Sequence, residues 1–481
     1  MIPVTSSFPS INLEKRLDYL IRYPHGCVEQ TTSSVFPQLY LSTFVKLNST
    51  RKIEVEKNIK AAIFKLQNFQ TSNGGFSYWR GGSTANNWGT IYASHFLIEA
   101  EKMGYTLPYG MKNKFINNLK SSARSWRKTT NSRYYRYQSH ETMQAYRLYV
   151  LALANSAEMG AMNRMKEISN LSVNAKWRLA GAYQLKGQNS VAKNMIFNAP
   201  TEIEAYRELS YSYGSSVRDE AMILEVLSLM KEKTKAAFMA KKVANQLGEN
   251  TWMSTQTTAY SLIAMSKFLE GKSTSNLMKF SYKLNGKGES VNSDIPVYVA
   301  KNSPKSSKDG KASLTNTGSG ILYVRLITKG IPVESNDLEK DNNLKMNVTY
   351  LDMNGSSIDP TKIKQGTDFK MKVTVFNPGI KGDLKEMALS QIFPSGWEIH
   401  NARMSNSSSN NGDSYYDYQD VRDDRVYTYF SLRNGKSKTF TVNLNATYDG
   451  KFYLPSILCE AMYDNSVSSV KPGKWVEVIR N

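Results

Sequence analysis

The sequence predicts a multidomain protein in which an all-helical part precedes β-structure: an α/α toroid of helical hairpins, a small β segment and an antiparallel β-sandwich. Apolar residues repeat at helical spacing up to about residue 270 and alternate after it. Short polar connections separate the helical patterns. With 481 residues, the chain is also too long for a single hydrophobic core.

The helical part covers residues 11–270. Leu13, Leu17, Leu20 and Ile21 lie at i, i+4, i+7 and i+8, on one face of a helix. The same periodicity predicts helices over residues 54–70, 88–103, 109–127, 141–154, 173–186, 215–230, 232–246 and 254–269. About a dozen helices joined by short polar turns indicate stacked hairpins, either a solenoid or a closed α/α toroid.

The small β segment covers residues 271–335. Alternating residues 280–284 end at Asn285-Gly286, a hairpin signal, and residues 296–299 and 321–326 continue the strand pattern. Two polar stretches interrupt or follow these strands. We expect a loop at residues 302–310 and a linker at residues 334–343.

The sandwich covers residues 340–481. Its short strand patterns are broken by Asn-Gly, Pro-Gly and Asp-Gly pairs, as is typical of an antiparallel β-sandwich. Residues 405–412 are nearly all Ser and Asn and predict a surface loop. Cys459 lies in a strand pattern and is expected to be a buried thiol. The acidic cluster at residues 417–424 lacks the order of a calcium loop, so we expect a structural turn.

Composition excludes several classes of function. The net charge is +21, but Lys and Arg are scattered and no nucleic-acid motif accompanies them, so we expect no nucleic-acid partner. No run of about 18 apolar residues predicts a membrane-spanning segment. The chain has only two Cys and four His, widely spaced, so we expect no disulfide framework, metal or other cofactor.

Cys27 and Gln30 stand three residues apart at the predicted start of a helix, where their side chains can meet. A thiol held against a carboxamide can expel ammonia and leave an internal thioester, an acyl electrophile that captures amines or hydroxyls. The spacing alone has little weight. A buried helical Cys followed by an ordinary exposed Gln gives the same pattern.

Longer motifs in the helical part give that pair its weight. YPHGCVEQTTS at residues 23–33 resembles the thioester motif of bacterial α2-macroglobulins, relatives of animal α2-macroglobulin and of the thioester proteins of complement. NGGFSYW at residues 73–79, followed by WGTIYA at 88–93, resembles the second signature of that family's thioester domain. WMSTQ at residues 252–256 resembles the segment that opens its last helix.

Motifs of the sandwich extend the resemblance over nearly the whole chain. FPSGWE, VRDDR and EAMYD, at residues 393–398, 421–425 and 460–464, are similar to the family's C-terminal macroglobulin domain. The resemblance implies a thioester domain at residues 11–270, the returning half of a CUB-like β domain at 271–335 and a receptor-binding-type domain at 340–481. Residues 1–10 are then a residual extended segment.

The family's full chain is several times longer, with upstream macroglobulin domains and a protease-sensitive bait segment. The resemblance therefore implies a C-terminal part whose partners include those upstream domains. Because the shielding domains are not in this chain, we expect its thioester to be unformed or hydrolysed.

By the same resemblance, Cys27 supplies the sulfur and Gln30 the acyl carbon. Gly26 is expected to let the backbone pass close to the thiol, and Pro24 to fix the entering chain. Glu29 is expected to be an exposed carboxylate that suits the helix dipole. Four aromatic residues are expected to exclude water, with plain core packing as the open alternative: Tyr23, Phe76, Tyr78 and Trp79.

Histidines offer one further candidate. Some thioester proteins use a His as an acyl relay, and His140, before the predicted helix at residues 141–154, is the candidate here, with a solvent-facing helix-start His as the alternative. His25 is close enough in sequence to tune the thiol's pKa. His95 lies in an apolar helix and is expected to be a core histidine.

The resemblance implies a broad-spectrum protease inhibitor, a single-use covalent trap and not an enzyme. Bait cleavage exposes the thioester, and a Lys amine of the protease attacks it. It also implies a periplasmic or cell-envelope location, with a lipid anchor upstream, and a role in bacterial defence. Two alternatives stay open: a covalent adhesin that uses the same bond, and an α/α toroid enzyme of terpenoid-cyclase-like fold, with a Cys27/His140 thiol hydrolase as a weaker variant.

Overall fold

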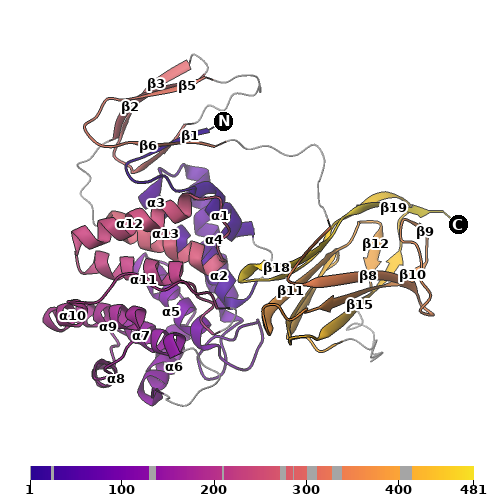
Figure 1. Ribbon diagram of the computed structural model, residues 1–481, viewed down its shortest axis with the longest axis horizontal. Helices are drawn as coiled ribbons and strands as arrows, with labels where there is room; N and C mark the ends of the chain where they lie inside the picture. The colour runs from indigo at the N-terminus through magenta and orange to yellow at the C-terminus, as the bar shows by residue number, and fades with distance from the viewer. Residues whose placement is uncertain are drawn as a thin grey trace. The chain divides into compact units, whose positions relative to one another are not determined.

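A computed structural model (Figure 1) describes residues 2–22, 26–128, 137–208, 211–270, 278–284, 287–300, 311–327, 339–400 and 414–480. Tyr23, Pro24 and His25, and the loops expected at residues 302–310 and 405–412, lie outside the described residues. The chain forms two compact units, which we call the toroid unit (Met1–Gly330) and the sandwich unit (Ile331–Asn481). In the described part, no helix is both long and apolar enough to cross a membrane.

Helices fill most of the toroid unit, as predicted. They are α1 (Leu13–Arg22), α2 (Val28–Val35), α3 (Leu41–Phe44), α4 (Ser49–Gln67), α5 (Asn87–Lys102), α6 (Met111–Ser125), α7 (Tyr137–Leu153), α8 (Met159–Lys166), α9 (Val173–Leu185), α10 (Asn189–Ile196), α11 (Ser216–Leu229), α12 (Lys233–Gly248) and α13 (Thr255–Glu270), with a 3-10 turn, η1 (Phe36–Tyr40), after α2. α4 begins earlier than residue 54 because the Asn48 side chain accepts a hydrogen bond from Arg51 N at 2.8 Å and caps the first turn.

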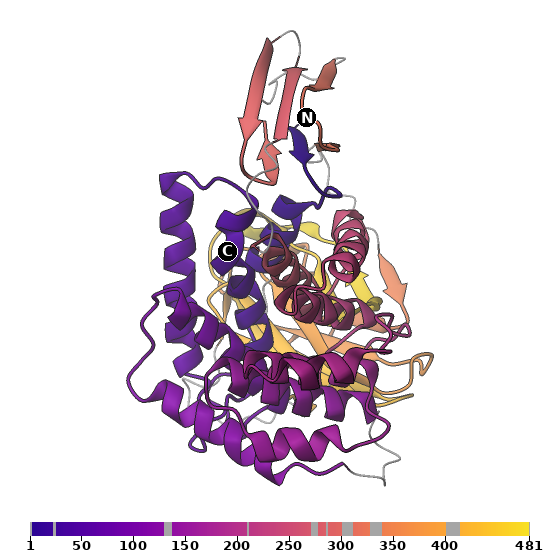
Figure 2. The same cartoon turned by 90° about the vertical axis from the view of Figure 1, so that its left-hand side faces the viewer.

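The helices form a closed α/α toroid, visible in Figures 1 and 2. α2, α5, α7, α9, α11 and α13 contact one another in turn, and α13 returns to contact α2. Outer helices lie against this inner ring: α4 contacts α2, α6 contacts α5 and α7, α10 contacts α9, and α12 contacts α11 and α13. Ring closure decides the open choice between solenoid and toroid, and it places α2 at the junction between the first and last inner helices.

Two small sheets complete the toroid unit. In one, β1 (Ile2–Ser6) lies between β4 (Val297–Val299) and β6 (Tyr323–Ile327). In the other, β2 (Met278–Leu284) lies between β3 (Lys287–Ser293) and β5 (Ala312–Asn316), and Leu284 stands opposite Lys287 as the predicted hairpin requires. The extended N-terminal segment is therefore a central strand. The finer domain boundaries at residues 10 and 270 stay predictions.

The sandwich unit contains two main sheets. One has the order β12 (Trp397–Ile399), β15 (Ser437–Ala446), β10 (Asp368–Phe376) and β8 (Lys345–Asp352). The other has the order β13 (Tyr418–Val421), β14 (Arg425–Leu432), β11 (Leu384–Ile392), β17 (Ile457–Ala461), β18 (Asp464–Lys471) and β7 (Lys340–Asn342). In β10 and β15, buried and more exposed residues alternate, so the inward-facing residues form the core between the sheets.

Two details of the sandwich unit differ from the sequence prediction. Part of the linker expected at residues 334–343 is strand β7, which pairs with β18, and Ser469 Oγ donates to Asp341 Oδ1 at 2.5 Å. A polar edge strand lacks the apolar alternation that identifies a strand in sequence. The small sheet β16 (Gly450–Leu454), β19 (Lys474–Ile479) and β9 (Lys362–Lys364) also contains one parallel pair, β19 with β9.

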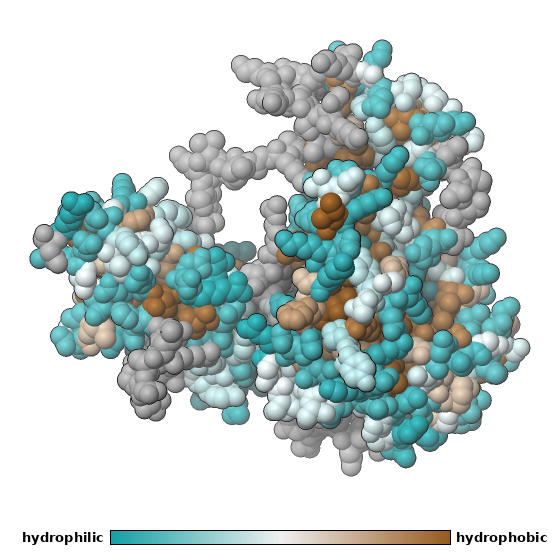
Figure 3. All heavy atoms as spheres, turned by 180° about the vertical axis from the view of Figure 1, so that it is seen from behind, coloured by the Kyte–Doolittle hydropathy of each residue, from teal (hydrophilic) through white to brown (hydrophobic). Residues whose placement is uncertain are grey.

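Hydrophilic side chains cover most of the face in Figure 3, and apolar residues appear in small groups among them. This is the usual surface of a folded protein, in which scattered apolar residues need no partner.

Candidate functional site

Cys27 is the N-cap residue of α2, a position normally held by Ser, Thr, Asp or Asn. Its Sγ accepts a hydrogen bond from Gln30 N at 3.5 Å, and Gln30 Oε1 accepts one from Cys27 N at 3.4 Å. This reciprocal pair is a capping box with a thiol in place of the usual hydroxyl. Cys27 has no exposed surface and Gln30 is 3 % exposed, so the alternative of a buried Cys followed by an exposed Gln is wrong.

The backbone around Cys27 is held on two sides. Val28 N donates to Tyr78 O at 2.9 Å, which ties the start of α2 to the connection between α4 and α5. On α5, a Cβ added at Gly89 would lie 2.4 Å from Val28 Cγ1, so only glycine lets the two helices approach this closely. A Cβ at Gly26 would lie 3.0 Å from Lys65 Nζ, so the side chain that Gly26 lacks leaves room for this lysine of α4.

The structure describes three of the four aromatic residues that are expected to exclude water from the thioester: Phe76, Tyr78 and Trp79. Phe76 is fully buried, its ring lies 6.2 Å from that of Phe115, and its N–H donates to Thr90 Oγ1 at 2.8 Å. Tyr78 and Trp79 are partly buried, with ring centroids 5.1 Å apart. These contacts describe core packing for Phe76, and the shielding role of all four aromatic residues stays a prediction.

Glu29 corrects the sequence expectation, because it is completely buried and not exposed. Ser33 Oγ donates to its Oε1 at 2.6 Å, and Thr255 Oγ1 donates to its Oε2 at 3.0 Å. Ser33 Oγ also lies 3.2 Å from Tyr92 OH on α5. The carboxylate thus links α2 to α13, and Ser33 links α2 to α5. The cause is the inner-ring position of α2, in which almost every residue is buried.

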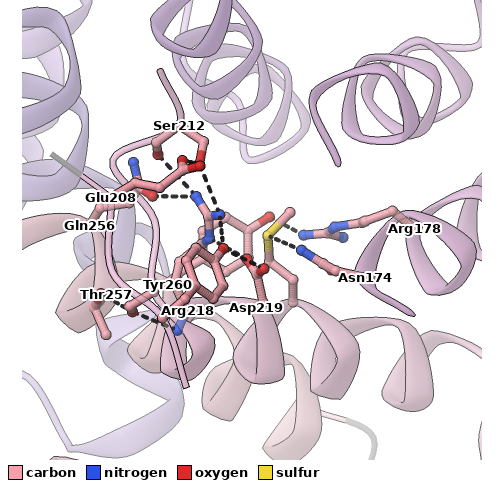
Figure 4. A network of polar contacts seen from close by, with 12 residues as sticks. Asn174, Arg178, Glu208, Ser212, Arg218, Asp219, Gln256, Thr257 and Tyr260 are labelled. Carbon is pink, nitrogen blue, oxygen red and sulfur yellow. Dashed lines mark hydrogen bonds and ion pairs between the residues drawn. The ribbon is translucent and has the colours of Figure 1, made fainter. Parts of the chain in front are cut away.

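A second network, missed by sequence reasoning, surrounds Arg218 of α11 (Figure 4). Its guanidinium is fully buried, lies 4.2 Å from the Trp88 ring centroid and donates to Asp219 Oδ1 at 2.6 Å and Gln256 Oε1 at 2.5 Å. Tyr206 OH donates to Asp219 Oδ2 at 2.6 Å. Side chains from α5, α11 and α13 therefore converge on one cation, as Figure 4 shows in part.

Arg178 of α9 forms the third buried group of polar side chains. Its Nη2 lies 2.7 Å from Glu225 Oε2, and its guanidinium lies over the Tyr149 ring at 4.4 Å. Tyr149 OH and Tyr260 OH each donate to Glu225 at 3.2 Å. One signal of this network is visible in the sequence: Glu225 is a charged residue inside the otherwise apolar run at residues 221–227.

The histidines have different outcomes. His95 is buried as expected, with Nδ1 2.8 Å from Tyr146 OH, and burial holds the pKa of its imidazole well below the usual value. His140 belongs to α7, but its side chain lies outside the described residues, as does His25. The relay role of His140 stays a prediction.

Two remaining expectations concern the sandwich unit. Cys459 is fully buried on β17, and burial raises the pKa of its thiol. In the acidic cluster, Asp420 pairs with Arg422 at 2.8 Å and Asp424 pairs with Arg425, at the turn between β13 and β14. Among the described residues, no group of three or more His, Cys, Asp or Glu is placed to hold a metal ion.

Comparison with known families matches both units. The family described as the A-macroglobulin TED domain matches residues 4–274, and the bacterial alpha-2-macroglobulin MG10 domain matches residues 344–465. Among curated proteins, the alpha-2-macroglobulin of Escherichia coli strain K12 is 23% identical over 95% of this chain and 28% of its own length. That of Xylella fastidiosa strain Temecula1 is 24% identical over 95% of this chain and 29% of its own length. The chain thus spans less than a third of these relatives.

Solved structures share the fold. Native alpha-2-macroglobulin from Escherichia coli, from domain MG7 to the C-terminus, aligns with a TM-score of 0.79 at 21% identity, over 99% of this chain and 77% of that chain. Salmonella alpha-2-macroglobulin reacted with methylamine aligns with a TM-score of 0.81 at 23% identity, over 99% of this chain and 31% of that chain. At such identities the likeness establishes the arrangement of helices and strands.

Proposed function

This chain belongs to the bacterial α2-macroglobulin family, and from that premise we propose that it acts in protease inhibition through an internal thioester between Cys27 and Gln30. The thioester captures an amine of the protease once and is consumed. The activity is therefore stoichiometric trapping without turnover.

The capping box at the start of α2 is the observation that carries this proposal. It holds a thiol and a carboxamide across one helical turn, with both residues buried. Attack of Cys27 Sγ on Gln30 Cδ forms the carbon–sulfur bond and breaks the bond to Nε2, which leaves with the thiol proton as ammonia. Cys27 N–H, which already holds Oε1, is placed to stabilise negative charge on that oxygen during the attack.

In capture, Gln30 Cδ is again the electrophile, and the Cys27 sulfur is now the leaving group. A primary amine attacks Cδ, a new amide bond forms, the carbon–sulfur bond breaks, and Cys27 regains its thiol proton from the amine. The description of the Salmonella relative as reacted with methylamine supports an acyl group open to small amines. On a protease, Lys side chains supply the equivalent amine.

Intact mass and peptide mapping of the chain test the proposal. A formed thioester makes the chain one ammonia lighter than its sequence, and methylamine then adds its full mass. A thioester that formed and was hydrolysed leaves glutamate at position 30, so past formation is detected as well. Cys27→Ala is the control, which should keep the sequence mass and its glutamine. Wild-type chain with unaltered glutamine under all conditions would refute the proposal.

Burial modifies one sequence expectation. The sequence alone predicts an unformed or hydrolysed bond. Hydrolysis requires water to reach Gln30 Cδ, and both Gln30, 3 % exposed, and Cys27, with no exposed surface, are buried, so we propose that the bond forms and persists long enough to be measured.

A protease assay tests the target class. Chain incubated with trypsin should give an adduct that survives denaturation, and methylamine added first should prevent it. An amide formed with Lys resists hydroxylamine, whereas an ester formed with a hydroxyl is cleaved. A hydroxylamine-sensitive adduct that is lost in His140→Ala would establish the acyl relay and preference for hydroxyls.

Location remains a proposal of the same kind. We propose that the protein resides in the periplasm or cell envelope, where foreign proteases are met. Fractionation of the source cells with an antibody against the sandwich unit would test it, and detection in the cytosolic fraction alone would contradict it.

The enzyme alternative has less support from the toroid. Terpenoid-cyclase-like enzymes need an open apolar cavity, but the inner helices α7, α9, α11 and α13 meet around Arg178 with buried Tyr146, Tyr149 and Tyr260 packed about it. The side chains at this point of the ring are therefore charged and polar, in contrast to the wall of an apolar substrate cavity.

A further inference from the structure

The first turn of α13 closes the inner ring against the thioester helix. Thr255, the first residue of α13, is 226 positions from Glu29 in sequence, and its hydroxyl donates to the Glu29 carboxylate at 3.0 Å. Both residues are buried. The turn is itself fixed, because Ser254 Oγ accepts from Thr257 N at 3.2 Å and so caps the helix.

The same turn is held from its other side. Gln256 Oε1 accepts from Arg218 Nη1 at 2.5 Å, and the Arg218 guanidinium is fixed by Asp219 and the Trp88 ring. Neighbouring residues of the WMSTQ motif therefore have separate tasks. Thr255 holds α2, and Gln256 holds α11.

Glu29 lies between the two reacting residues, in the same helical turn. Its carboxylate accepts Thr255 Oγ1 from α13 and Ser33 Oγ from the next turn of α2. The start of α2 is held separately, because Val28 N donates to Tyr78 O at 2.9 Å. A distortion of the first turn that breaks the contact between Glu29 and Thr255 would therefore also move Gln30 Cδ relative to Cys27 Sγ. Nucleophilic attack is sensitive to displacements on the order of 1 Å, so the contact that fixes α2 also sets the reactive geometry.

We propose that Glu29 and Thr255 form a clamp that positions Cys27 and Gln30 for thioester formation, with Ser33 supporting the carboxylate. Thr255 is a positioning residue, because its hydroxyl binds the Glu29 carboxylate and acts on the reacting pair through it. The inference rests on the thioester proposed above and assigns a role to the motif at residues 252–256.

Thr255→Val tests the clamp, since it removes the hydroxyl and keeps the shape. We expect the ratio of reacted to unreacted glutamine at position 30, read by peptide mapping at a fixed time after expression, to fall about tenfold, the effect of one hydrogen bond to a charged group. Thr255→Ser keeps the hydroxyl and should stay within about twofold of wild type.

Thr258→Val is the matched control on the same helix. Thr258 is fully buried, and its hydroxyl has no hydrogen-bond partner among the described residues, so the variant should react as wild type does. Melting temperature is measured for every variant. A purely structural role for Thr255 would lower the melting temperature and leave the reacted fraction unchanged.

The outcomes separate the two proposals. Wild-type chain that never loses ammonia and never acquires glutamate at position 30 would overturn the thioester and the clamp together. Wild-type chain that reacts while Thr255→Val reacts equally well would overturn the clamp alone. Equal losses in Thr255→Val and Thr255→Ser would also overturn it, because the hydroxyl would then not be the group responsible.

Discussion

The toroid unit and the sandwich unit differ in how many charged side chains they bury. Buried ionisable side chains of the toroid unit are numerous: Arg16, Glu29, His95, Glu99, Glu141, Arg147, Arg178, Glu208, Arg218, Asp219, Glu220 and Glu225. The buried polar side chains described in the sandwich unit carry no charge: Asn377, Ser390, Gln391, Thr428 and Ser469. Both units have extensive apolar cores, so hydrophobicity alone does not explain the difference.

The difference follows from what each element must specify. A sandwich strand has one inward face, and alternation of apolar residues fixes which side chains point inward. α11 and α13 are buried nearly all round, so hydrophobic burial gives them no preferred rotation about their axes. We infer that directional contacts to Glu29, Arg178 and Arg218 set the rotation of the inner helices. Burying a charge is costly, and it is tolerated where it fixes one arrangement.

The largest expected effect is the loss of one buried cation of the toroid unit. Arg178→Met removes the partner of Glu225 and leaves that carboxylate buried, which should lower the free energy of unfolding by about 3–5 kcal/mol. Urea denaturation followed by the far-UV signal of the helices would measure it. Arg178→Met combined with Glu225→Gln should recover part of the loss. If the free energy of unfolding of Arg178→Met lay within about 1 kcal/mol of the wild-type value, the buried charges would not explain the difference between the two units.

An intermediate effect concerns pH. His95 is buried with Nε2 3.9 Å from Glu99 and 3.8 Å from Glu225, and burial lowers its pKa far below the ordinary value near 6.5. Below pH 6.5 the unfolded chain binds a proton at this position that the folded chain does not, so stability falls as pH falls. The expected loss between pH 7 and pH 5 is about 2 kcal/mol.

His95→Gln isolates that contribution. Denaturation at several pH values should show a shallower loss for the variant, while the other histidines contribute equally to both proteins. Parallel stability curves for wild type and variant would contradict the assignment of the slope to His95.

The smallest expected effect is in the sandwich unit and has the opposite sign. Gln391 is fully buried on β11, and neither of its amide atoms has a hydrogen-bond partner among the described residues. Gln391→Met removes two unsatisfied polar atoms at similar volume and should raise the free energy of unfolding by about 1 kcal/mol. Thermal unfolding would show it. Destabilisation would mean that the sandwich unit, too, depends on a buried polar contact.

Sequence reasoning succeeded where the signal is local. Apolar periodicity predicted the helices and the change to strands, and the motif around Cys27 singled out the thiol and the carboxamide that the structure brings together. It did not predict the burial of Glu29, because that depends on contact with Thr255 at the other end of the helical part. A carboxylate in a first helical turn usually faces solvent, and only ring closure encloses this one.

Strand β7 and the parallel pair of β9 with β19 were missed for a similar reason. Short polar strands at sheet edges form because a partner strand is available, and their own residues carry no alternation to identify them.

The capping box affects how a chain that has captured an amine differs from one that has never reacted. After an amine is captured, position 30 still carries a carbonyl oxygen and Cys27 again carries a thiol, so the same two hydrogen bonds that begin α2 can re-form. A spent chain and one that has never reacted would then share the same helix start and the same circular dichroism. The two chains would then be distinguished by the mass of the attached amine, which mass spectrometry measures.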